Sequence, residues 1–242
     1  MLKAYPPLVR MNHSTPIIQP SKSPSHTEEN YLKAVYKLAE AEPTMPGVST
    51  NRIAGALATR AASVTDMLRR LADKGLLNYE KYRGVQLTAE GQRLALLTIR
   101  KHRLWEVFLV QQLGFNWDEV HEVAEELEHV QSPLLMRRLD AFLGHPALDP
   151  HGDPIPTENG AMPRPAHRLL ADLGVGAYGT LAAVKNTSAP FLQYLDKAGL
   201  QLGAVVEVLD KITFDNSFEI RVNRERTVLI SAEVSRNLFV TE

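Results

Sequence analysis

The sequence feature that most constrains the fold is residues 121–129, a helical segment with ionisable groups where a core face would be apolar. At 100° per residue, one arc of roughly 100° holds four of these groups, namely His121, Glu125, Glu128 and His129. Their spacing of i, i+4, i+7 and i+8 otherwise marks an apolar core stripe. Such a face packs poorly but can hold a divalent cation, because imidazole and carboxylate groups are ligands of Mn, Fe, Co and Zn.

The preceding helical segment repeats this pattern with His102 and Glu106, one turn apart. A single His and Glu pair at this spacing usually faces water. Here two consecutive helices carry such groups, and no Lys or Arg lies between 119 and 136 to neutralise them. The pattern therefore favours a metal site, and because the chain has no Cys, its ligands must be nitrogen and oxygen atoms.

The length and composition are those of a globular protein with one large domain or two to three small ones, since the chain has 242 residues of which 44% are hydrophobic. No run is long and apolar enough to span a membrane, and a cytoplasmic location is expected. The net charge of −1 neither favours nor excludes nucleic acid. The proline-rich residues 1–25 are expected to form a disordered tail.

Residues 26–95 have the pattern of a winged helix-turn-helix domain, which consists of three helices followed by a β-hairpin. Thr27 and Ser49 are expected to cap the first two helices and Thr88 the helix after the hairpin. The predicted helices cover 27–41, 49–57 and 62–74, and the predicted strands cover 76–80 and 85–87.

The outer face of the third helix and the turn of the hairpin carry hydroxyl and basic groups, as phosphate contacts and base edges require. The candidate DNA-binding residues are Ser49, Arg60, Ser63, Thr65, Arg69, Arg70, Lys81 and Arg83. The alternative is a protein-interaction module, since Asp66 and Asp73 dilute the positive charge.

Residues 96–150 predict a helical dimerisation and metal-binding domain. A long helix should end near Gly114, residues 116–119 have the spacing of a capping box, and Pro133 should start a third helix. These helices carry more Leu, Trp and Phe than so short a region can bury, which predicts an isologous dimer. Residues 151–172 are expected to be a linker, and His145 and His151 to be ordinary loop histidines.

Residues 173–242 predict a small SH3-like β-barrel. The expected strands cover 179–184, 204–209, 217–222 and 227–230, with a short helix over 189–198. The fold class is therefore mainly α with a β-rich C-terminal part.

Three stretches give the chain a family resemblance: 79–84 in the wing, 100–104 in the long helix, and Glu128-His129 with its preceding helix. The linker stretch 152–156 adds to it. Over roughly 26–240, the chain resembles the diphtheria toxin repressor family of metal-dependent bacterial transcriptional repressors, which includes the manganese transport regulators. The resemblance implies a dimer that binds operator DNA when loaded with metal and is not an enzyme.

The resemblance also implies two metal positions. The primary position would use Asn30, Glu125, Glu128 and His129, and the ancillary position would use His102, Glu106 and His121. The iron-responsive branch has Cys where this chain has Glu125, and its first-helix ligand is Met, or Asp in the manganese branch, where this chain has Asn30. Lys33 replaces a further first-helix Glu of the manganese branch, and Ala182 and Lys185 replace polar ligands from the SH3-like domain.

The hard oxygen donors Glu125 and Asn30 favour Mn(II) as effector, with Fe(II) as the alternative. A different class of function is a di-metal carboxylate enzyme or storage bundle. Such bundles use paired Glu-x-x-His motifs, and this chain has one, at Glu126 to His129. A third alternative, a metal-independent winged-helix regulator that senses an organic ligand, leaves the ionisable helix face unexplained.

Overall fold

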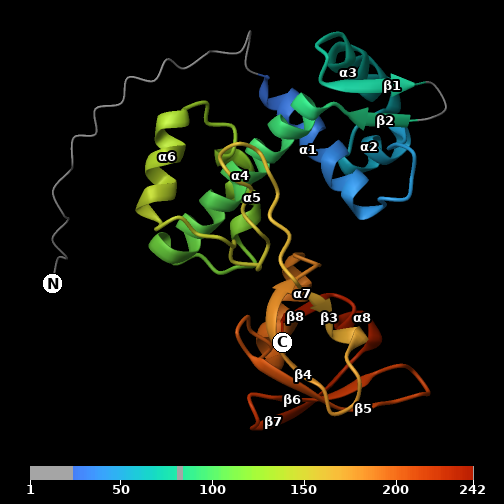
Figure 1. The fold of residues 1–242 in the computed structure, drawn as a ribbon, viewed down its shortest axis with the longest axis vertical. Helices are drawn as coiled ribbons and strands as arrows, with labels where there is room; N and C mark the ends of the chain where they lie inside the picture. The colour runs from blue at the N-terminus through green and yellow to red at the C-terminus, as the bar shows by residue number, and fades with distance from the viewer. Residues whose placement is uncertain (1–23, 81–83, 242) are drawn as a thin grey trace, which may run out of the picture.

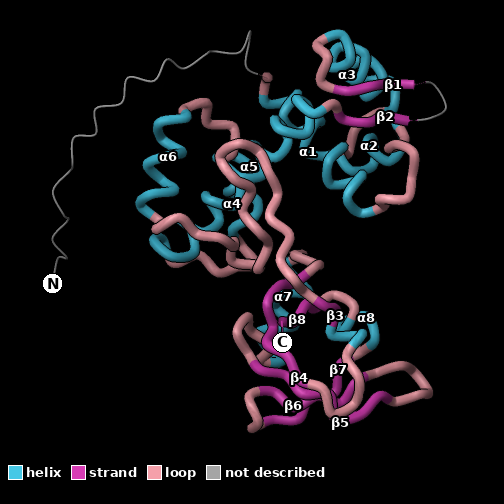
Figure 2. Tube along the Cα trace, viewed as in Figure 1, coloured by secondary structure: helices cyan, strands magenta, loops and turns pink. Residues whose placement is uncertain are grey.

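The computed structural model describes residues 24–80 and 84–241. Figure 1 shows three groups of elements along the chain: a winged-helix group, a helical group and a β-rich group. Figure 2 shows that the helices gather in the first two groups and most strands in the third. The fold is mainly α with a β-rich C-terminal part, as predicted. No helix in the described ranges is long and apolar enough to cross a membrane.

The winged-helix group comprises α1 (His26–Ala41), α2 (Thr50–Ala56), α3 (Ala61–Asp73) and the antiparallel hairpin of β1 (Leu77–Glu80) and β2 (Gly84–Leu87). Its core contains side chains from all three helices, including Leu32, Ile53 and Leu68. The predicted elements are confirmed, and Ser49 caps α2 by accepting a hydrogen bond from the Arg52 amide. The turn at 81–83 lies outside the described residues, as do residues 1–23.

The cap of α1 differs from the prediction. Ser25, rather than Thr27, precedes the helix and forms a capping box with Glu28. The predicted capping box at 116–119 is only half formed: the Asn116 amide donates to the Glu119 carboxylate, but the helix that follows, α5 (Val120–Leu127), starts one residue after Glu119 with no side-chain cap.

The helical group comprises α4 (Ala89–Leu113), α5 (Val120–Leu127) and α6 (Pro133–Phe142). Thr88 caps α4, and Gly114 ends it with a positive φ of 72°. At 1.5 Å per residue, the 25 residues of α4 span roughly 37 Å. Its first turns belong to the winged-helix core, and its later turns pack on α5 and α6. This single helix therefore joins the DNA-binding group to the ionisable cluster.

The stretch after α6 is not a free linker at its start. His151 and Gly152 are buried, and the Val184 amide donates to the His151 carbonyl oxygen at 2.9 Å. Gly152 has a φ of +86°, and a Cβ there would lie 2.0 Å from the Ala182 carbonyl oxygen, so only glycine fits. The predicted linker of 151–172 also includes, at its end, β3 (Arg168–Leu169) and a 3-10 turn (Leu170–Asp172).

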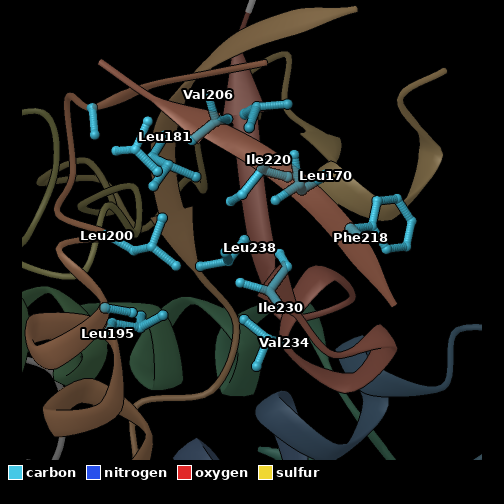
Figure 3. Packing of buried hydrophobic residues seen from close by; sticks show 14 of the residues in the cluster. Leu170, Leu181, Leu195, Leu200, Val206, Phe218, Ile220, Ile230, Val234 and Leu238 are labelled. Carbon is cyan, nitrogen blue, oxygen red and sulfur yellow. The ribbon is translucent and has the colours of Figure 1, made fainter. Parts of the chain in front are cut away.

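The β-rich group is a six-stranded antiparallel sheet in the order β3-β8-β4-β5-β6-β7. Its further elements are β4 (Tyr178–Val184), α7 (Ala189–Ala198), β5 (Val205–Lys211), β6 (Phe218–Val222), β7 (Arg226–Ile230), α8 (Ala232–Ser235) and β8 (Leu238–Thr241). Figure 3 shows Leu181, Val206, Ile220 and Leu238 meeting in its core. The four predicted strands and α7 are confirmed, whereas β3, α8 and β8 were not predicted.

Candidate metal centre and DNA-binding face

His102 and Glu106 lie one turn apart on α4, and His121 meets them from the first turn of α5. The His102 Nε2 atom is 3.0 Å from Glu106 Oε1 and 3.1 Å from His121 Nδ1. His121 Nδ1 is 3.5 Å from the same Glu106 oxygen. The structure thus brings together the three residues that the resemblance assigns to the ancillary position.

These three donor atoms have the spacing of one face of a metal coordination shell. Ligand atoms about 2.1 Å from an octahedral ion lie about 3 Å from their neighbours. The adjoining cavity of about 40 Å³ exceeds the roughly 10–15 Å³ that one water molecule needs. Two imidazoles and a carboxylate suit a divalent cation such as Mn, Fe, Co or Zn, so the residues present fit such an ion.

Two further donors, His151 and Asp149, were missed at the sequence level. They are 2% and 7% exposed, and their ligand atoms lie within 4.8 Å of one another and of a Glu106 oxygen. The prediction of an ordinary loop histidine is therefore wrong for His151, because its loop folds back onto α4. His145 does behave as an exposed loop histidine, and its Nδ1 lies 2.8 Å from an Asp140 oxygen.

Arg103 fixes this loop from the neighbouring position on α4. Its guanidinium lies 3.3 Å from Asp149 and 2.7 Å from Asp153. One Asp149 oxygen also accepts the amide hydrogens of His151 and Asp153. The alternation of acid and imidazole at 149, 151 and 153 was the only sign of this site in the sequence. We call His102, Glu106, His121, Asp149 and His151 together the Glu106 centre. Within it, both oxygens of Asp149 are already engaged, one by two backbone amides and the other by Arg103, so Asp149 supports the loop and the other four residues offer the ligand atoms.

Hydrogen bonds orient two imidazoles of the centre. The His151 Nε2 atom lies 2.8 Å from the Trp117 carbonyl oxygen, which can only accept, so Nε2 carries the proton and Nδ1 presents its lone pair toward Glu106. The His102 Nδ1 atom lies 2.7 Å from a Glu128 oxygen, which directs Nε2 toward Glu106. A carboxylate or carbonyl behind an imidazole is the usual support of a metal-ligating histidine.

The residues predicted for the primary position have a different arrangement, since Lys33 of α1 lies among them. Its Nζ atom is 2.7 and 2.8 Å from the two Glu128 oxygens and 3.2 Å from Glu125 Oε1. Lys33 is 7% exposed and Glu128 is 0% exposed. Glu128 therefore pairs with an ammonium group and supports His102, and Glu125 pairs with the same ammonium group.

Of the two other residues of the predicted primary set, His129 lies near Glu128, with its Nε2 atom 3.9 Å from Glu128 Oε1, whereas Asn30 does not face it. His129 Nδ1 lies 2.7 Å from Glu29 Oε2, and the His129 ring stacks on His26. The other Glu29 oxygen accepts from Lys101 at 2.9 Å. Asn30 is exposed, so its assignment as the first-helix ligand is not supported. From α1, Glu29 contacts His129 and Lys33 contacts Glu125 and Glu128, and the helical pattern alone did not identify these contacts.

Burial and opposite charges compete in setting the pKa values of the acids. Burial raises the pKa of Glu106, but hydrogen bonds from His102 and His121 outweigh burial and lower it. Burial likewise raises the pKa of Glu128, but hydrogen bonds from His102 and Lys33 lower it overall. Burial raises the pKa of Asp149 to about 8, and the charges of Asp153 and Glu106 act in the same direction. Burial lowers the pKa of His102, yet hydrogen bonds to Glu106 and Glu128 raise it overall. A divalent ion at this site would displace such protons.

The candidate DNA-binding face lies on the exposed side of α3. Arg60, Ser63, Arg69 and Arg70 are exposed there, and Thr65 is partly exposed. The Thr65 hydroxyl donates to the Ala61 carbonyl oxygen, and Arg69 lies 3.7 Å from Asp66. Ser49 is also exposed, at the start of α2. The wing residues Lys81 and Arg83 lie outside the described ranges.

Sequence profiles of known domains match most of the chain. Residues 25–85 match the profile described as "Iron dependent repressor, N-terminal DNA binding domain". Residues 88–157 match "Iron dependent repressor, metal binding and dimerisation domain", and residues 168–242 match "FeoA domain". These matches give no support to a di-metal enzyme or storage bundle.

Individual relatives agree with the profiles. The iron-dependent repressor IdeR of Mycobacterium tuberculosis is 40% identical over 57% of this chain and 60% of its own length. The chain thus spans less than two thirds of that relative. The diphtheria toxin repressor of Corynebacterium diphtheriae is 32% identical over 76% of this chain and 85% of its own length.

A solved structure, described as a manganese-dependent transcriptional repressor in complex with manganese, superposes with a TM-score of 0.80. It is 36% identical and covers 88% of this chain and 99% of its own. Both manganese- and iron-dependent repressors thus occur among the relatives. The chain belongs to the diphtheria toxin repressor family.

Proposed function

We propose that this protein is a metal-dependent transcriptional repressor that binds operator DNA as a homodimer when a divalent cation is bound at the Glu106 centre. The observation that carries the proposal is that imidazole and carboxylate donors converge beside a small cavity. Two of these donors lie on α4, the helix that begins in the winged-helix core. A bound cation would add positive charge beside the buried Glu106 carboxylate.

The residues of the chain would link this centre to DNA in two ways. His102 and Glu106 lie on α4, whose first turns pack in the winged-helix core. His102 also contacts Glu128, which pairs with Lys33 on α1. Ordering the centre therefore restrains both helices that carry the DNA-binding group. A preference of a few kcal/mol for the DNA-competent geometry is enough to change operator occupancy strongly.

The exposed face of α3 would enter the major groove, with Arg60, Arg69 and Arg70 supplying phosphate or base contacts and Ser63 and Thr65 base contacts. Ser49 and the wing residues Lys81 and Arg83 would contact the backbone. A two-fold dimer places two such faces on half-sites about one helical turn, or a multiple of one, apart. The dimerisation profile over 88–157 supports this arrangement.

We propose Mn(II) as the effector, with Fe(II) as the alternative. The donors of the Glu106 centre include the Glu106 carboxylate, which suits Mn(II), and no sulfur, while the three imidazoles suit Fe(II) and make it the alternative. The manganese-bound repressor structure aligns with this chain over 99% of its own length, which supports Mn(II) as the effector. Such a repressor would act in the cytoplasm, where it would lower the expression of metal-uptake functions as the ion accumulates.

The test begins with selection of binding sequences from a random duplex pool in the presence of Mn(II). Binding of the selected duplex is then measured by fluorescence anisotropy under anaerobic conditions, with Mn(II), with Fe(II) and with a chelator. We expect tight binding with Mn(II) and loss of binding with the chelator. Equal binding in the chelator would contradict the proposal, and activation by Fe(II) alone would contradict the choice of Mn(II).

A further inference from the structure

The contacts of Lys33 distinguish the Glu128 side of the cluster from the Glu106 centre. Its ammonium group lies within 2.8 Å of both Glu128 oxygens and 3.2 Å from Glu125, and both Lys33 and Glu128 are buried. We infer that Lys33 is a built-in cation that takes the place of a second metal ion, so that the chain binds one regulatory ion, at the Glu106 centre.

The groups around Lys33 do not fit a metal ion. Both oxygens of Glu128 already accept hydrogen bonds, from Lys33 and His102. His129 is held by Glu29, which Lys101 also contacts. An ammonium group has three donors and no lone pair, so it cannot itself ligate an ion, and it repels a divalent ion placed among its partners.

The position of Lys33 also gives it a mechanical role. Lys33 belongs to α1, whereas Glu125 lies on α5 and Glu128 at its end. The ion pair therefore joins the DNA-binding group to the helical group without metal. Glu128 in turn contacts His102, which places Lys33, Glu128 and His102 in one chain of contacts ending at the Glu106 centre.

This inference deepens the proposed function, but its test is independent of DNA. The chelator-treated full-length protein is titrated with Mn(II) alone, and bound metal per chain is measured by calorimetry and by mass spectrometry of metals. We expect one Mn(II) per chain in the wild type and none in Glu106→Gln. Two ions per chain in the wild type would overturn the inference.

Lys33→Glu adds a carboxylate beside Glu125 and Glu128 in place of the ammonium group. We expect this variant to bind a second Mn(II) per chain and to have a melting temperature that falls in chelator and recovers with Mn(II). Lys197→Glu is the charge-matched control, because Lys197 is an exposed lysine near the end of α7, away from the residues that line the cavity. It should still bind one ion.

The outcomes separate this inference from the proposed function. A Lys33→Glu protein that still binds one ion would contradict the idea that Lys33 excludes the second. If Lys33→Glu does not fold, the stoichiometry of the wild type and of Glu106→Gln decides the question. One Mn(II) per wild-type chain with no metal-dependent DNA binding would support this inference and refute the proposed function.

Discussion

The Glu106 centre and the Lys33–Glu128 cluster lie side by side and are built from the same residue types. They share His102, whose two ring nitrogens face Glu106 on one side and Glu128 on the other. Glu128 is in direct contact with the Lys33 ammonium group, whereas Glu106 contacts the imidazoles of His102, His121 and His151 beside a cavity of about 40 Å³ that Lys33 also lines. The donor set alone therefore does not identify a metal site, because a nearby lysine can occupy the place of the ion.

The largest effect expected is that of Lys33→Met on the stability of the metal-free protein. The variant leaves the buried Glu128 with imidazole partners, His102 and the more distant His129, and leaves Glu125 with His121 in place of the ammonium contact. Breaking a buried ion pair in this way costs about 3–5 kcal/mol. Urea denaturation in chelator should show this loss, whereas Lys37→Met should change the free energy of unfolding far less. Equal effects of the two variants would mean that the Lys33 ion pair contributes little.

Glu106→Gln should abolish the high-affinity metal site. Loss of a residue behind a metal ligand costs about 10–100-fold in affinity, and a direct carboxylate ligand should cost at least roughly 100-fold, or about 2.8 kcal/mol. Calorimetry with Mn(II) measures the change. Glu122→Gln, an exposed acid on α5, is the control and should retain wild-type affinity. Tight Mn(II) binding in Glu106→Gln would place the ion elsewhere.

His151→Ala should weaken Mn(II) binding by about 10–100-fold, since it removes one imidazole of the centre but leaves the Glu106 carboxylate. The ring also contacts the Trp117 carbonyl, so retention of the fold is checked by circular dichroism. His145→Ala removes an exposed imidazole from the same loop and should leave the affinity unchanged. An unchanged affinity in His151→Ala would reduce the centre to the three residues on α4 and α5.

The smallest expected effect is that of Arg60→Ala at the start of α3. Loss of one phosphate contact should weaken binding to all duplexes alike and reduce the salt dependence by about one phosphate. Arg224→Ala, an exposed arginine of the β-rich group, is the control. If the salt slope of Arg60→Ala equals that of the control, Arg60 does not contact the backbone.

The sequence predicted the parts of the fold and site that depend on local spacing. Helical periodicity placed His102 above Glu106, and the caps at Ser49 and Thr88 are short-range hydrogen bonds. The order of winged helix, helices and β-rich part also followed from local patterns. The strand β8 was missed because it is short and depends on pairing with distant strands.

The part of the site that could not be predicted depends on contacts far apart in the sequence. The Lys33 side chain meets Glu128 across 95 residues, and nothing in the spacing of either helix specifies that contact. His151 reaches Glu106 because Gly152 packs on β4 and Arg103 holds Asp149. These are tertiary contacts. The family resemblance therefore showed only that Lys33 stands where the manganese branch has Glu, and His151 appeared as a loop histidine.

The most direct test is a crystal structure of the Mn(II)-loaded protein, with anomalous scattering used to locate the ion. We expect one manganese peak per chain, ligated by His102 Nε2, Glu106 and His121 Nδ1, with Lys33 still paired to Glu128. A manganese ion ligated by Glu125, Glu128 and His129, with the Lys33 side chain displaced, would contradict it.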